Sequence, residues 1–314
     1  MSDRLSPEEH EQIREENRRE FLAGTEERDR PRAVLLSGQP GAGKSELSKE
    51  AVRELDREGG AVVVDADSLR ERHPRYGDHM RADDLTAAER THADAAQWAV
   101  ELAADARDSR RNIVVDGTLK NPDRAEALAR SLRAKGYEVE VRAMAVAKED
   151  AELGVKRRYW ARKERDGAGR WVPTQVQDAA REGQEPTLRR LEHEGAVDRI
   201  SVYRRGNPPE CIYENRDAWR SGRDGAAAAL VAERERPRSP QELAERAARQ
   251  RELEETVKRV QEAEKNKREN APRTQEERDQ FKQVNTDKSQ RAEERDCAQL
   301  NGKSKPPKPH LLER

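Results

Sequence analysis

One stretch near the start of the chain, residues 33–45 (AVLLSGQPGAGKS), limits the possible folds more than any other part of the sequence. Its apolar beginning, residues 33–36, predicts a buried strand, and a helix is expected over about residues 45–57. Between them, the spacing GxxxxGKS, which starts at Gly38, matches the phosphate-binding loop without a mismatch. A strand, a glycine-rich turn and a helix in this order gather backbone N–H groups around an anion at the helix N-terminus.

Each residue type in this loop has a physical task. Gly38, Gly41 and Gly43 let consecutive N–H groups turn inward without a Cβ in the way. Lys44 can reach the outer phosphates, and the Ser45 hydroxyl is placed to ligate Mg²⁺. The predicted nucleotide-binding residues are Gly38, Gln39, Pro40, Gly41, Ala42, Gly43, Lys44 and Ser45. The chain is therefore expected to bind a nucleoside triphosphate.

The overall composition excludes several classes of protein. Charged residues make up 40% of the chain and aromatic residues only 4%, so some of its length must be solvated helix or disorder. A net charge of −1 gives no bulk attraction to nucleic acid or to an acidic membrane surface. Cys211 and Cys297 lack the spacing of a disulfide framework or a zinc site. With a polar N-terminus and no apolar run of membrane length, we expect a soluble, cytoplasmic protein that contacts neither nucleic acid nor membrane.

From residue 33 to about residue 232 the pattern alternates between strands and helices. Strands are expected at 33–36, 61–65, 112–116, 137–147, 199–203 and 210–213, and helices at 86–108, 121–133, 149–163 and 174–194. Helices of this length between strands indicate βαβ units, and hence an α/β fold with a doubly wound, mostly parallel sheet of the P-loop kinase type. Ligands of such sheets bind at the carboxyl ends of the strands.

Two charged segments flank this predicted domain. In residues 1–32, Ser6 and Glu9 form the pattern of a capping box, so a helix is expected to reach about Leu22. Its apolar residues are too sparse for a buried helix, which indicates a surface arm laid on the core or on a partner. Residues 233–314 carry almost no large apolar side chains and sustain no heptad. We expect a charged, helical or disordered tail outside the catalytic fold.

Acidic residues follow two of the expected strands. Asp65 and Asp116 each close an apolar run, and either could support the Mg²⁺ shell held by Ser45. Asp67 lies two residues beyond the second strand, where its carboxylate could accept a proton from a substrate hydroxyl. An N-cap role before a helix starting at Ser68 explains Asp67 equally well, and both interpretations stay open.

Two further regions contain candidates for ligand contact. Asn121, with the Pro and Asp that follow it, supplies the cap of the next helix, which leaves Thr118 to contact a ligand or to form an ordinary turn. Arg158 and Arg170 flank a segment with two glycines that is typical of a mobile lid, which would bring guanidinium groups onto transferring phosphates. Because 63 of the 314 residues are Lys or Arg, a solvated surface charge is the alternative for either arginine.

Taken together, these motifs resemble the zeta toxin family of P-loop kinases, the toxic half of bacterial toxin–antitoxin systems. The matching pieces, in order, are GQPGAGKS from Gly38, VVVDAD ending at Asp67, HPRY from His73, DGT from Asp116, RRY from Arg157 and GRWVP from Gly169. The resemblance covers roughly residues 30–215, and the order and spacing of the set are more specific than any single motif.

The resemblance implies an activity and residue roles. Members of this family use ATP or GTP, with Mg²⁺, to phosphorylate the 3′-hydroxyl of the amino sugar in UDP-N-acetylglucosamine and related UDP-sugars, which poisons cell-wall synthesis. By position, Asp67 would be the catalytic base. Arg158 and Arg170 would stabilise the transferring phosphate together with Lys44, and Thr118 would contact the UDP-sugar. The phosphate-binding loop keeps the roles given above.

The sequence departs from the family pattern on the side of the acceptor sugar. The family usually has Glu before the Gly-Thr pair, where this chain has the shorter Asp116 as its expected substrate contact. An acid that the family supplies from the preceding helix has no match in register, and Glu101 is the nearest candidate for substrate binding. The family also implies a partner, a small helical antitoxin that covers the nucleotide site. Residues 7–22 would either meet such a partner or act in its place.

Two other functions fit the same motifs. One is a P-loop kinase for another small hydroxyl compound, such as an antibiotic or a metabolite, which would share Lys44 and Asp67 but not the UDP contacts. The other is a nucleotide-gated binding protein that hydrolyses slowly and signals through its tail. In that case the carboxylates at the strand ends would serve only Mg²⁺.

Overall fold

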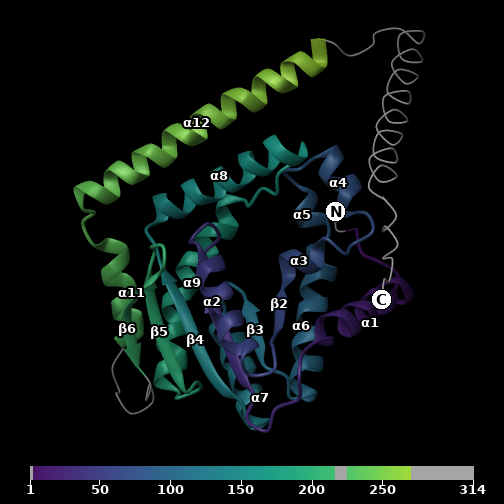
Figure 1. The fold of residues 1–314 in the computed structure, drawn as a ribbon, viewed down its shortest axis with the longest axis vertical. Coiled ribbons are helices and arrows are strands. Elements are labelled where there is room, and N and C mark those ends of the chain that lie inside the picture. The colour runs from purple at the N-terminus through teal and green to yellow at the C-terminus, as the bar shows by residue number, and fades with distance from the viewer. Residues whose placement is uncertain (1–2, 216–224, 270–314) are drawn as a thin grey trace, which may run out of the picture. The chain divides into compact units, whose positions relative to one another are not determined.

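The computed structural model describes residues 3–215 and 225–269 of the chain. A six-stranded sheet forms its centre, with the strand order β2-β3-β1-β4-β5-β6 (Figure 1). The strands are β1 (Arg32–Ser37), β2 (Val62–Asp65), β3 (Ile113–Asp116), β4 (Glu138–Ala145), β5 (Arg199–Arg204) and β6 (Glu210–Asn215). Neighbouring strands pair in parallel except β6, which runs antiparallel to β5. The predicted α/β fold with a doubly wound, mostly parallel sheet is confirmed.

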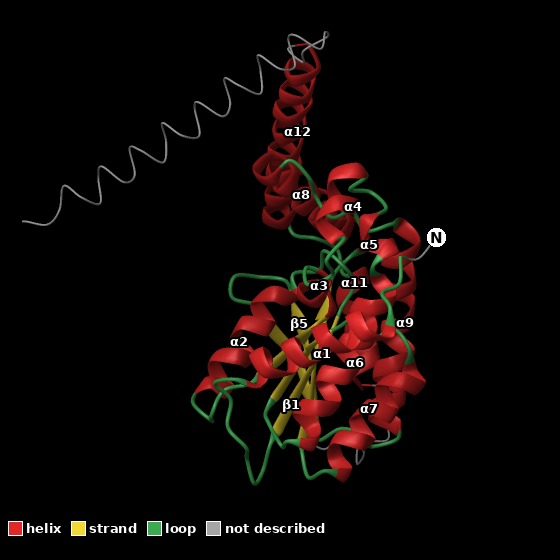
Figure 2. Cartoon of the chain, turned by 90° about the vertical axis from the view of Figure 1, so that its right-hand side faces the viewer, coloured by secondary structure: helices red, strands yellow, loops and turns green. Residues whose placement is uncertain are grey.

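Helices cover both faces of this sheet. They are α1 (Pro7–Leu22), α2 (Lys44–Asp56), α3 (Ala66–Arg70), α4 (Tyr76–Ala82), α5 (Ala87–Arg90), α6 (His92–Asp108), α7 (Pro122–Ala134), α8 (Lys148–Asp166), α9 (Thr174–His193), α11 (Gly225–Glu235) and α12 (Pro240–Glu269). Side chains of β1 alternate between the faces: Ala33 and Leu35 pack into one apolar cluster, and Val34 and Leu36 into the other. Figure 2 shows α2 on one side of the strands and α6 and α7 on the other. This arrangement buries β1 on both faces. The carboxyl end of β1, where the glycine-rich loop begins, lies at the edge of the sheet that the carboxyl ends of the parallel strands form.

One predicted helix is divided in the structure. The periodic pattern predicts a single helix over residues 86–108, but α5 ends at Arg90 and α6 begins at His92. Between them Thr91 leaves helical geometry, with φ −104° and ψ 4°, and its hydroxyl donates to the Ala87 carbonyl at 3.3 Å. For α3 the sequence offers only the open alternative of a helix starting at Ser68, and it does not predict α4, because helices of five and seven residues are too short to show a periodic pattern.

The N-terminal helix lies on the core. The predicted capping box is present, since the Ser6 hydroxyl accepts from the Glu9 N–H and the Glu9 carboxylate accepts from the Ser6 N–H. Ile13 packs against the main apolar cluster, and the Trp98 indole on α6 donates to the His10 carbonyl at 3.2 Å. Of the two placements expected for this arm, on the core or on a partner, the structure has the first.

The chain is divided by its contacts into two compact units, Met1–Val260 and Gln261–Arg314. The boundary predicted after residue 232 falls inside α11, whose Leu230 belongs to the main core. The next helix, α12, buries three of its side chains, all within the first unit. The first part of the predicted tail is therefore helical and packed, and the part from residue 270 onward lies outside the described residues.

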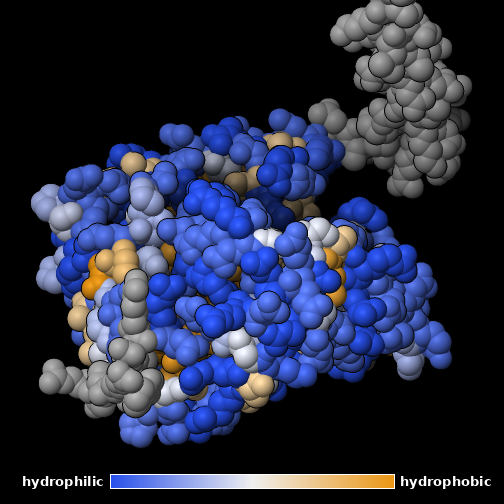
Figure 3. All heavy atoms as spheres, turned by 60° about the horizontal axis from the view of Figure 1, so that its bottom comes forward, coloured by the Kyte–Doolittle hydropathy of each residue, from blue (hydrophilic) through white to orange (hydrophobic). Residues whose placement is uncertain are grey.

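The surface of the molecule is strongly polar. Figure 3 shows a face covered mostly by hydrophilic side chains, with apolar side chains in small groups. In the part of the chain that the structure describes, no helix is long and apolar enough to cross a membrane. Charged residues make up 40% of the chain, and many of them lie at the surface. This is expected because burying an unpaired charge costs free energy.

Candidate active site

The glycine-rich loop between β1 and α2 forms a cradle for an anion. Gly43 is the N-cap of α2 with φ 93°, and Gly41 has φ 79°, a backbone region that glycine adopts without strain. A Cβ on Gly41 would lie 2.1 Å from the Ala151 carbonyl oxygen, so no larger residue fits against α8. The buried side-chain oxygen of Gln39 has no hydrogen-bond partner among the described residues. Backbone donors at a helix N-terminus fit an anion such as a triphosphate.

Lys44 joins this loop to the neighbouring strand end. Its Nζ donates to the Gly38 carbonyl at 3.0 Å and lies 3.8 Å from a carboxylate oxygen of Asp116, with 13% of the side chain exposed. Burial lowers the pKa of Lys44; the Asp116 carboxylate opposes this shift, and the charge of Arg158 adds to it. The Lys44 ammonium is thus positioned to exchange its hydrogen bond with the Gly38 carbonyl for one with a phosphate oxygen, while it stays beside the loop.

Asp65 is the N-cap of α3. Its carboxylate accepts from the Asp67 N–H at 2.9 Å, from the Ser68 N–H at 3.3 Å and from the Ser68 hydroxyl at 2.8 Å. The alternative in which Asp67 caps a helix beginning at Ser68 is therefore wrong, because the helix starts two residues earlier and Asp65 caps it. This arrangement leaves the carboxylate of Asp67 available for other contacts.

Asp67 lies between two arginines. Its Oδ1 accepts from Arg70 at 2.5 Å and from Arg170 at 2.8 Å, and its Oδ2 forms an ion pair with a second nitrogen of Arg170. The side chain remains 42% exposed. Partial burial alone would raise the pKa of Asp67, but the charges of Arg170 and Arg70 outweigh it and hold the pKa below its ordinary value. Asp67 is therefore an ionised, oriented carboxylate at the carboxyl edge of the sheet.

Asp116 is the second acid at this edge. The sheet register places Asp116 directly opposite Asp65. The Asp116 carboxylate forms an ion pair with the Lys44 ammonium. Burial raises the pKa of Asp116; Lys44 lowers it in part, and the nearby carboxylates of Asp65 and Asp67 raise it further. Three acids and one lysine thus share the space beyond β2, β3 and the glycine-rich loop.

The predicted lid carries Arg170 and is anchored by a carboxylate that the sequence analysis missed. Asp84 accepts from the Gly169 N–H at 3.1 Å and from the Tyr159 hydroxyl at 3.1 Å, and its Oδ2 lies 3.2 Å from the Lys163 ammonium. These contacts fix the loop next to α8 and direct Arg170 toward Asp67. No sequence signal distinguishes Asp84 from a solvated acid, since it lies in the polar segment RADDLT.

The other predicted arginine, Arg158, lies on α8 and is exposed. It makes no hydrogen bond or ion pair with any of the residues that the structure describes, yet its charge acts on Lys44, Asp67 and Asp116. A cation that is near the acids but uncommitted to them is available to an incoming anion.

The predicted substrate contacts are placed differently from one another. Thr118 follows β3, its carbonyl accepts from the Ser37 hydroxyl at 3.4 Å, and within the described residues its own hydroxyl makes no hydrogen bond. Glu101 contacts His10 at 3.2 Å and Gln97 at 2.9 Å, so it belongs to the contact between α1 and α6. Its carboxylate is committed to that contact, and the structure does not bring it together with Asp67 and Asp116.

The donor set limits how a metal ion could be held. Within residues 3–215 and 225–269, no group of three or more His, Cys, Asp or Glu side chains could hold a metal ion. Mg²⁺ often takes only one or two protein ligands and completes its shell with phosphate oxygens and water. The Ser45 hydroxyl at the start of α2 fits this pattern. Of the two acids considered for support, Asp65 is used as a cap, which leaves Asp116.

A parallel sheet, a glycine-rich loop at the end of its central strand β1 and acids at the adjacent strand ends define an α/β protein of the P-loop class. Within that class, the chain belongs to the zeta toxin family, whose pattern matches residues 18–217. This match includes β1 to β6 and every candidate site residue described above, and it ends before α11 and α12.

Individual relatives agree with this assignment. The chain is 28% identical to Toxin PezT of Streptococcus pneumoniae serotype 4 (strain ATCC BAA-334 / TIGR4) over 212 residues, which is 66% of this chain and 81% of the relative. It is 28% identical to Toxin zeta of Enterococcus hirae over 191 residues, which is 60% of this chain and 66% of that one.

Solved structures show the same fold. A structure from the PezAT chromosomal toxin–antitoxin system of Streptococcus pneumoniae superposes with a TM-score of 0.70 at 25% identity, covering 81% of this chain and 98% of that chain. The structure of AvrRxo1-ORF1:-ORF2 with ATP gives a TM-score of 0.58 at 16% identity, covering 80% of this chain and 86% of that one. At that identity the second likeness concerns the fold alone.

Proposed function

We propose that this chain is a toxin that acts as a nucleoside-triphosphate-dependent kinase and phosphorylates the 3′-hydroxyl of the amino sugar of UDP-N-acetylglucosamine or a related UDP-sugar. One observation carries the proposal. An ionised, partly exposed carboxylate, Asp67, lies at the sheet edge beside the glycine-rich loop and is held there by arginines that could also bind a phosphate. A base, a phosphate cradle and a movable cation are the parts that phosphoryl transfer requires.

The phosphate side of the reaction rests on the loop and on Lys44. The loop N–H groups hold the β- and γ-phosphates of ATP or GTP, and Lys44 exchanges its contact with Gly38 for a γ-phosphate oxygen. Ser45 would hold Mg²⁺ through its hydroxyl, and the ion would supply positive charge to the phosphates. Arg158 and Arg170 stabilise the charge that spreads over the transferring group.

The acceptor side rests on Asp67. The acceptor hydroxyl attacks the γ-phosphorus, its O–P bond forms while the bond to the bridging oxygen breaks, and the nucleoside diphosphate leaves. The hydroxyl proton passes to Asp67. Two guanidinium groups make this carboxylate a weak base in the substrate-free arrangement. We therefore expect Arg170 to move from Asp67 to the γ-phosphate when substrates bind, which frees an oxygen and raises the proton affinity of Asp67.

A second kinase function is favoured by a specific observation on the acceptor side. Glu101 is used at the contact between α1 and α6, and Asp116 is directed to Lys44. Only Thr118 then remains uncommitted among the three expected sugar contacts. An acceptor other than a UDP-sugar, such as an antibiotic or another hydroxyl metabolite, would keep the chemistry of Lys44 and Asp67 and change only these contacts.

We also propose an antitoxin partner. Solved structures similar to this chain include one from the PezAT toxin–antitoxin system and one of the AvrRxo1-ORF1:-ORF2 complex. A small helical protein that covers the nucleotide site would block transfer without touching the fold. In this chain α1 is packed on α6, so the partner is expected as a separate protein.

The experiment is phosphorus NMR of the purified protein with ATP, Mg²⁺ and a panel of UDP-sugars. A new sugar phosphate signal is expected for one member of the panel, with ADP formed in equal amount. Transfer only to acceptors outside the panel would favour the second kinase function. Slow release of inorganic phosphate with no acceptor signal would instead support a nucleotide-gated binding protein and contradict both kinase proposals.

A further inference from the structure

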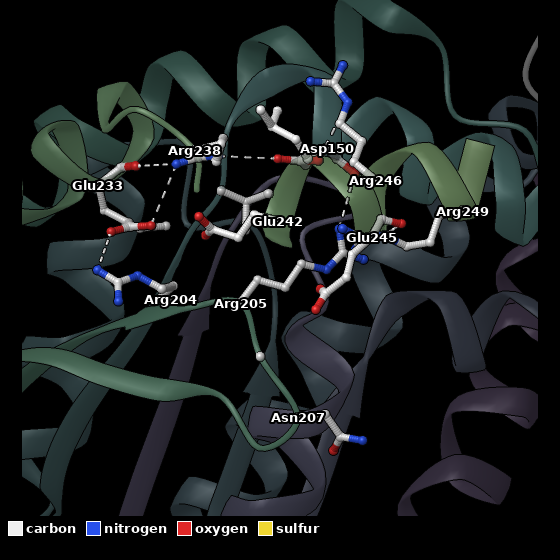
Figure 4. Close-up of a pocket in the computed structure, with 14 residues that line it drawn as sticks. Asp150, Arg204, Arg205, Asn207, Glu233, Arg238, Glu242, Glu245, Arg246 and Arg249 are labelled. Atoms are coloured by element: carbon white, nitrogen blue, oxygen red, sulfur yellow. Dashed lines mark hydrogen bonds and ion pairs between the residues drawn. The ribbon is translucent and has the colours of Figure 1, made fainter. Parts of the chain in front are cut away.

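A cavity lies next to the glycine-rich loop, on the side away from the acids. It measures about 270 Å³ and is bordered by the carboxyl ends of β4 and β5, the turn that leads to β6, the start of α8 and the first turns of α12 (Figure 4). Asp150 of α8, Arg205 of the turn, and Arg246 and Arg249 of α12 are among its lining residues. The cavity is therefore built from the family fold and from a helix that lies outside the family match.

Arg205 connects the cavity to the phosphate-binding loop. A Cβ built on Gly43 would lie 3.5 Å from the Arg205 Nε, so this guanidinium lies directly beside the N-cap of α2. One of its terminal nitrogens donates to the Asp150 carbonyl at 3.1 Å, which ties the turn to α8. A ligand in the loop and a ligand in the cavity would thus share Arg205 as a neighbour.

The strand order decides which end of a nucleotide faces the cavity. In the sheet, β3 and β2 lie on one side of β1 and carry Asp116, Asp65 and, just beyond, Asp67. On the other side lie β4 and β5, whose carboxyl ends border the cavity. If the γ-phosphate points toward the base Asp67, the nucleoside must extend the opposite way, toward β4 and β5.

Helix α12 is attached to this region by ion pairs and by apolar contacts. Arg246 lies 3.8 Å from the carboxylate of Asp150, and Arg259 lies 2.6 Å from the carboxylate of Glu164 on α8. Leu253 is 7% exposed and Val260 is 5% exposed. The first unit of the chain accordingly extends through α12 as far as Val260.

One face of α12 changes its character along its length. Arg246, Arg249, Leu253, Thr256 and Val260 follow each other at intervals of three and four residues, so they share a face. The three residues toward the C-terminal end of this set are buried. The two arginines at its beginning are half-buried and line the cavity. The buried face of the helix therefore ends in two cations at the cavity.

Five arginines and four acids line the cavity, and one of these acids, Asp150, is shared by Arg238 and Arg246. Burial lowers the pKa of Arg205, the charges of Arg249 and Arg157 lower it further, and the charge of Asp150 opposes this shift. Arg249 donates its Nε to the Glu245 carbonyl at 3.3 Å, which leaves its terminal nitrogens for other acceptors. A polar ligand rich in acceptors would relieve the repulsion between Arg205 and Arg249.

We propose that α12 forms one wall of the nucleoside subsite and that Arg246 and Arg249 bind the ribose and base of the nucleotide whose phosphates occupy the loop. The inference rests on the proposed function, because it takes the P-loop ligand to be a nucleoside triphosphate. Guanidinium groups donate to ribose and base acceptors and stack on the flat face of a base, which suits both roles. Part of the segment expected to lie outside the catalytic fold then contributes to nucleotide binding.

The test compares two ligands that differ only in the nucleoside. Dissociation constants for Mg²⁺ with ATP and for Mg²⁺ with inorganic tripolyphosphate are measured by calorimetry for the full chain and for the double variant Arg246→Ala, Arg249→Ala. Arg251→Ala is the matched control, since Arg251 lies on the exposed side of the same helix. We expect the double variant to weaken ATP binding by about tenfold and to leave tripolyphosphate binding unchanged, and the control to change neither.

Other outcomes overturn the inference in distinguishable ways. Unchanged or tighter ATP binding by the double variant would show that α12 is no part of the subsite, and equal weakening of both ligands would place the arginines at the phosphates. A native chain that binds neither ligand would contradict the proposed function itself. If the double variant does not fold by circular dichroism, Arg249→Gln alone is measured against the same criterion, with at least a threefold loss for ATP only expected.

Discussion

Asp67, just beyond β2, and Asp116, the last residue of β3, lie at the same edge of the sheet, yet their surroundings are opposite in charge. After β2, Asp67 accepts from Arg70 and Arg170, and their charges keep its pKa below the ordinary value. At the end of β3, Asp116 is partly buried, with one lysine at 3.8 Å and two other carboxylates nearby, and its pKa is raised. The charges around each acid decide the difference, because burial raises the pKa of both acids and only around Asp67 do cations outweigh that effect.

This comparison separates the tasks of the two acids. A carboxylate held in place by guanidiniums stays ionised and oriented, and it becomes a better base when a phosphate draws one guanidinium away. A carboxylate next to Lys44 instead sets the charge of the phosphate-binding lysine.

Lys44→Ala removes the lysine that the comparison assigns to Asp116. We expect turnover to fall by roughly ten-thousand-fold and ATP binding to weaken as well, because a cation on the γ-phosphate is lost together with its ground-state contact. Turnover and the ATP dissociation constant are measured side by side. Lys49→Ala is the matched control, since Lys49 is exposed on the same helix and pairs only with Glu46 among the described residues. Normal turnover by the Lys44→Ala variant would contradict the proposal that Lys44 binds the γ-phosphate.

Asp67→Asn keeps size and hydrogen bonding but cannot take the hydroxyl proton. We expect transfer to fall by about a hundred- to ten-thousand-fold, the usual contribution of a general base. The ATP dissociation constant should hardly change, because the phosphates contact the loop and Lys44. In cells, this variant should no longer arrest growth. Near-normal transfer by Asp67→Asn, together with an inactive Asp116→Asn, would mean that the base is the other carboxylate.

The sequence predicts the acids at the strand ends but does not show that Asp67 and Asp116 have different surroundings and different tasks. The P-loop spacing, the strand-end acids and the capping box at Ser6 depend on residues close together in the chain, and each is present in the structure. Arg70 is local to Asp67, three residues away in α3, but Arg170 reaches Asp67 and Lys44 reaches Asp116 from distant parts of the chain, and only the folded sheet brings these together. The misplaced candidate, Glu101, contacts His10 of α1, a residue 91 positions away that no local pattern connects with it.

The packing of α12 was equally hidden, for a different physical reason. The sequence of this helix has few apolar residues, and composition alone therefore predicts a solvated segment. Its attachment uses ion pairs to α8 together with Leu253 and Val260, which are too few to form a recognisable stripe. Pairing between charges far apart in sequence is not encoded in any local pattern.

Asp116→Asn tests the second half of the comparison through pH. Asp116 opposes the lowering of the Lys44 pKa, so its removal should lower that pKa further. A lysine is charged below its pKa, and the variant should therefore lose activity at a lower pH on the alkaline side than the native enzyme. We expect roughly a tenfold loss of turnover at neutral pH and a larger loss as pH rises. Rate profiles of equal shape for both enzymes would show that Asp116 does not set the charge of Lys44.

Asp65 provides the smallest and most specific test, because it lies at the same edge and serves neither role. Its carboxylate caps α3 by accepting from the Asp67 and Ser68 N–H groups. Asp65→Ala should cost about 1 kcal/mol of folding stability, as loss of an N-cap does, whereas Asp65→Asn should be nearly neutral because Asn is an equally good cap. Thermal unfolding of the two variants measures this difference.

Turnover should fall no more than a few-fold in Asp65→Ala, because Asp67 is held less firmly, and should stay normal in Asp65→Asn. A large loss of turnover in Asp65→Asn, with unchanged stability, would mean that the charge of Asp65 acts on the substrates, and the division between Asp67 and Asp116 would have to include a third acid.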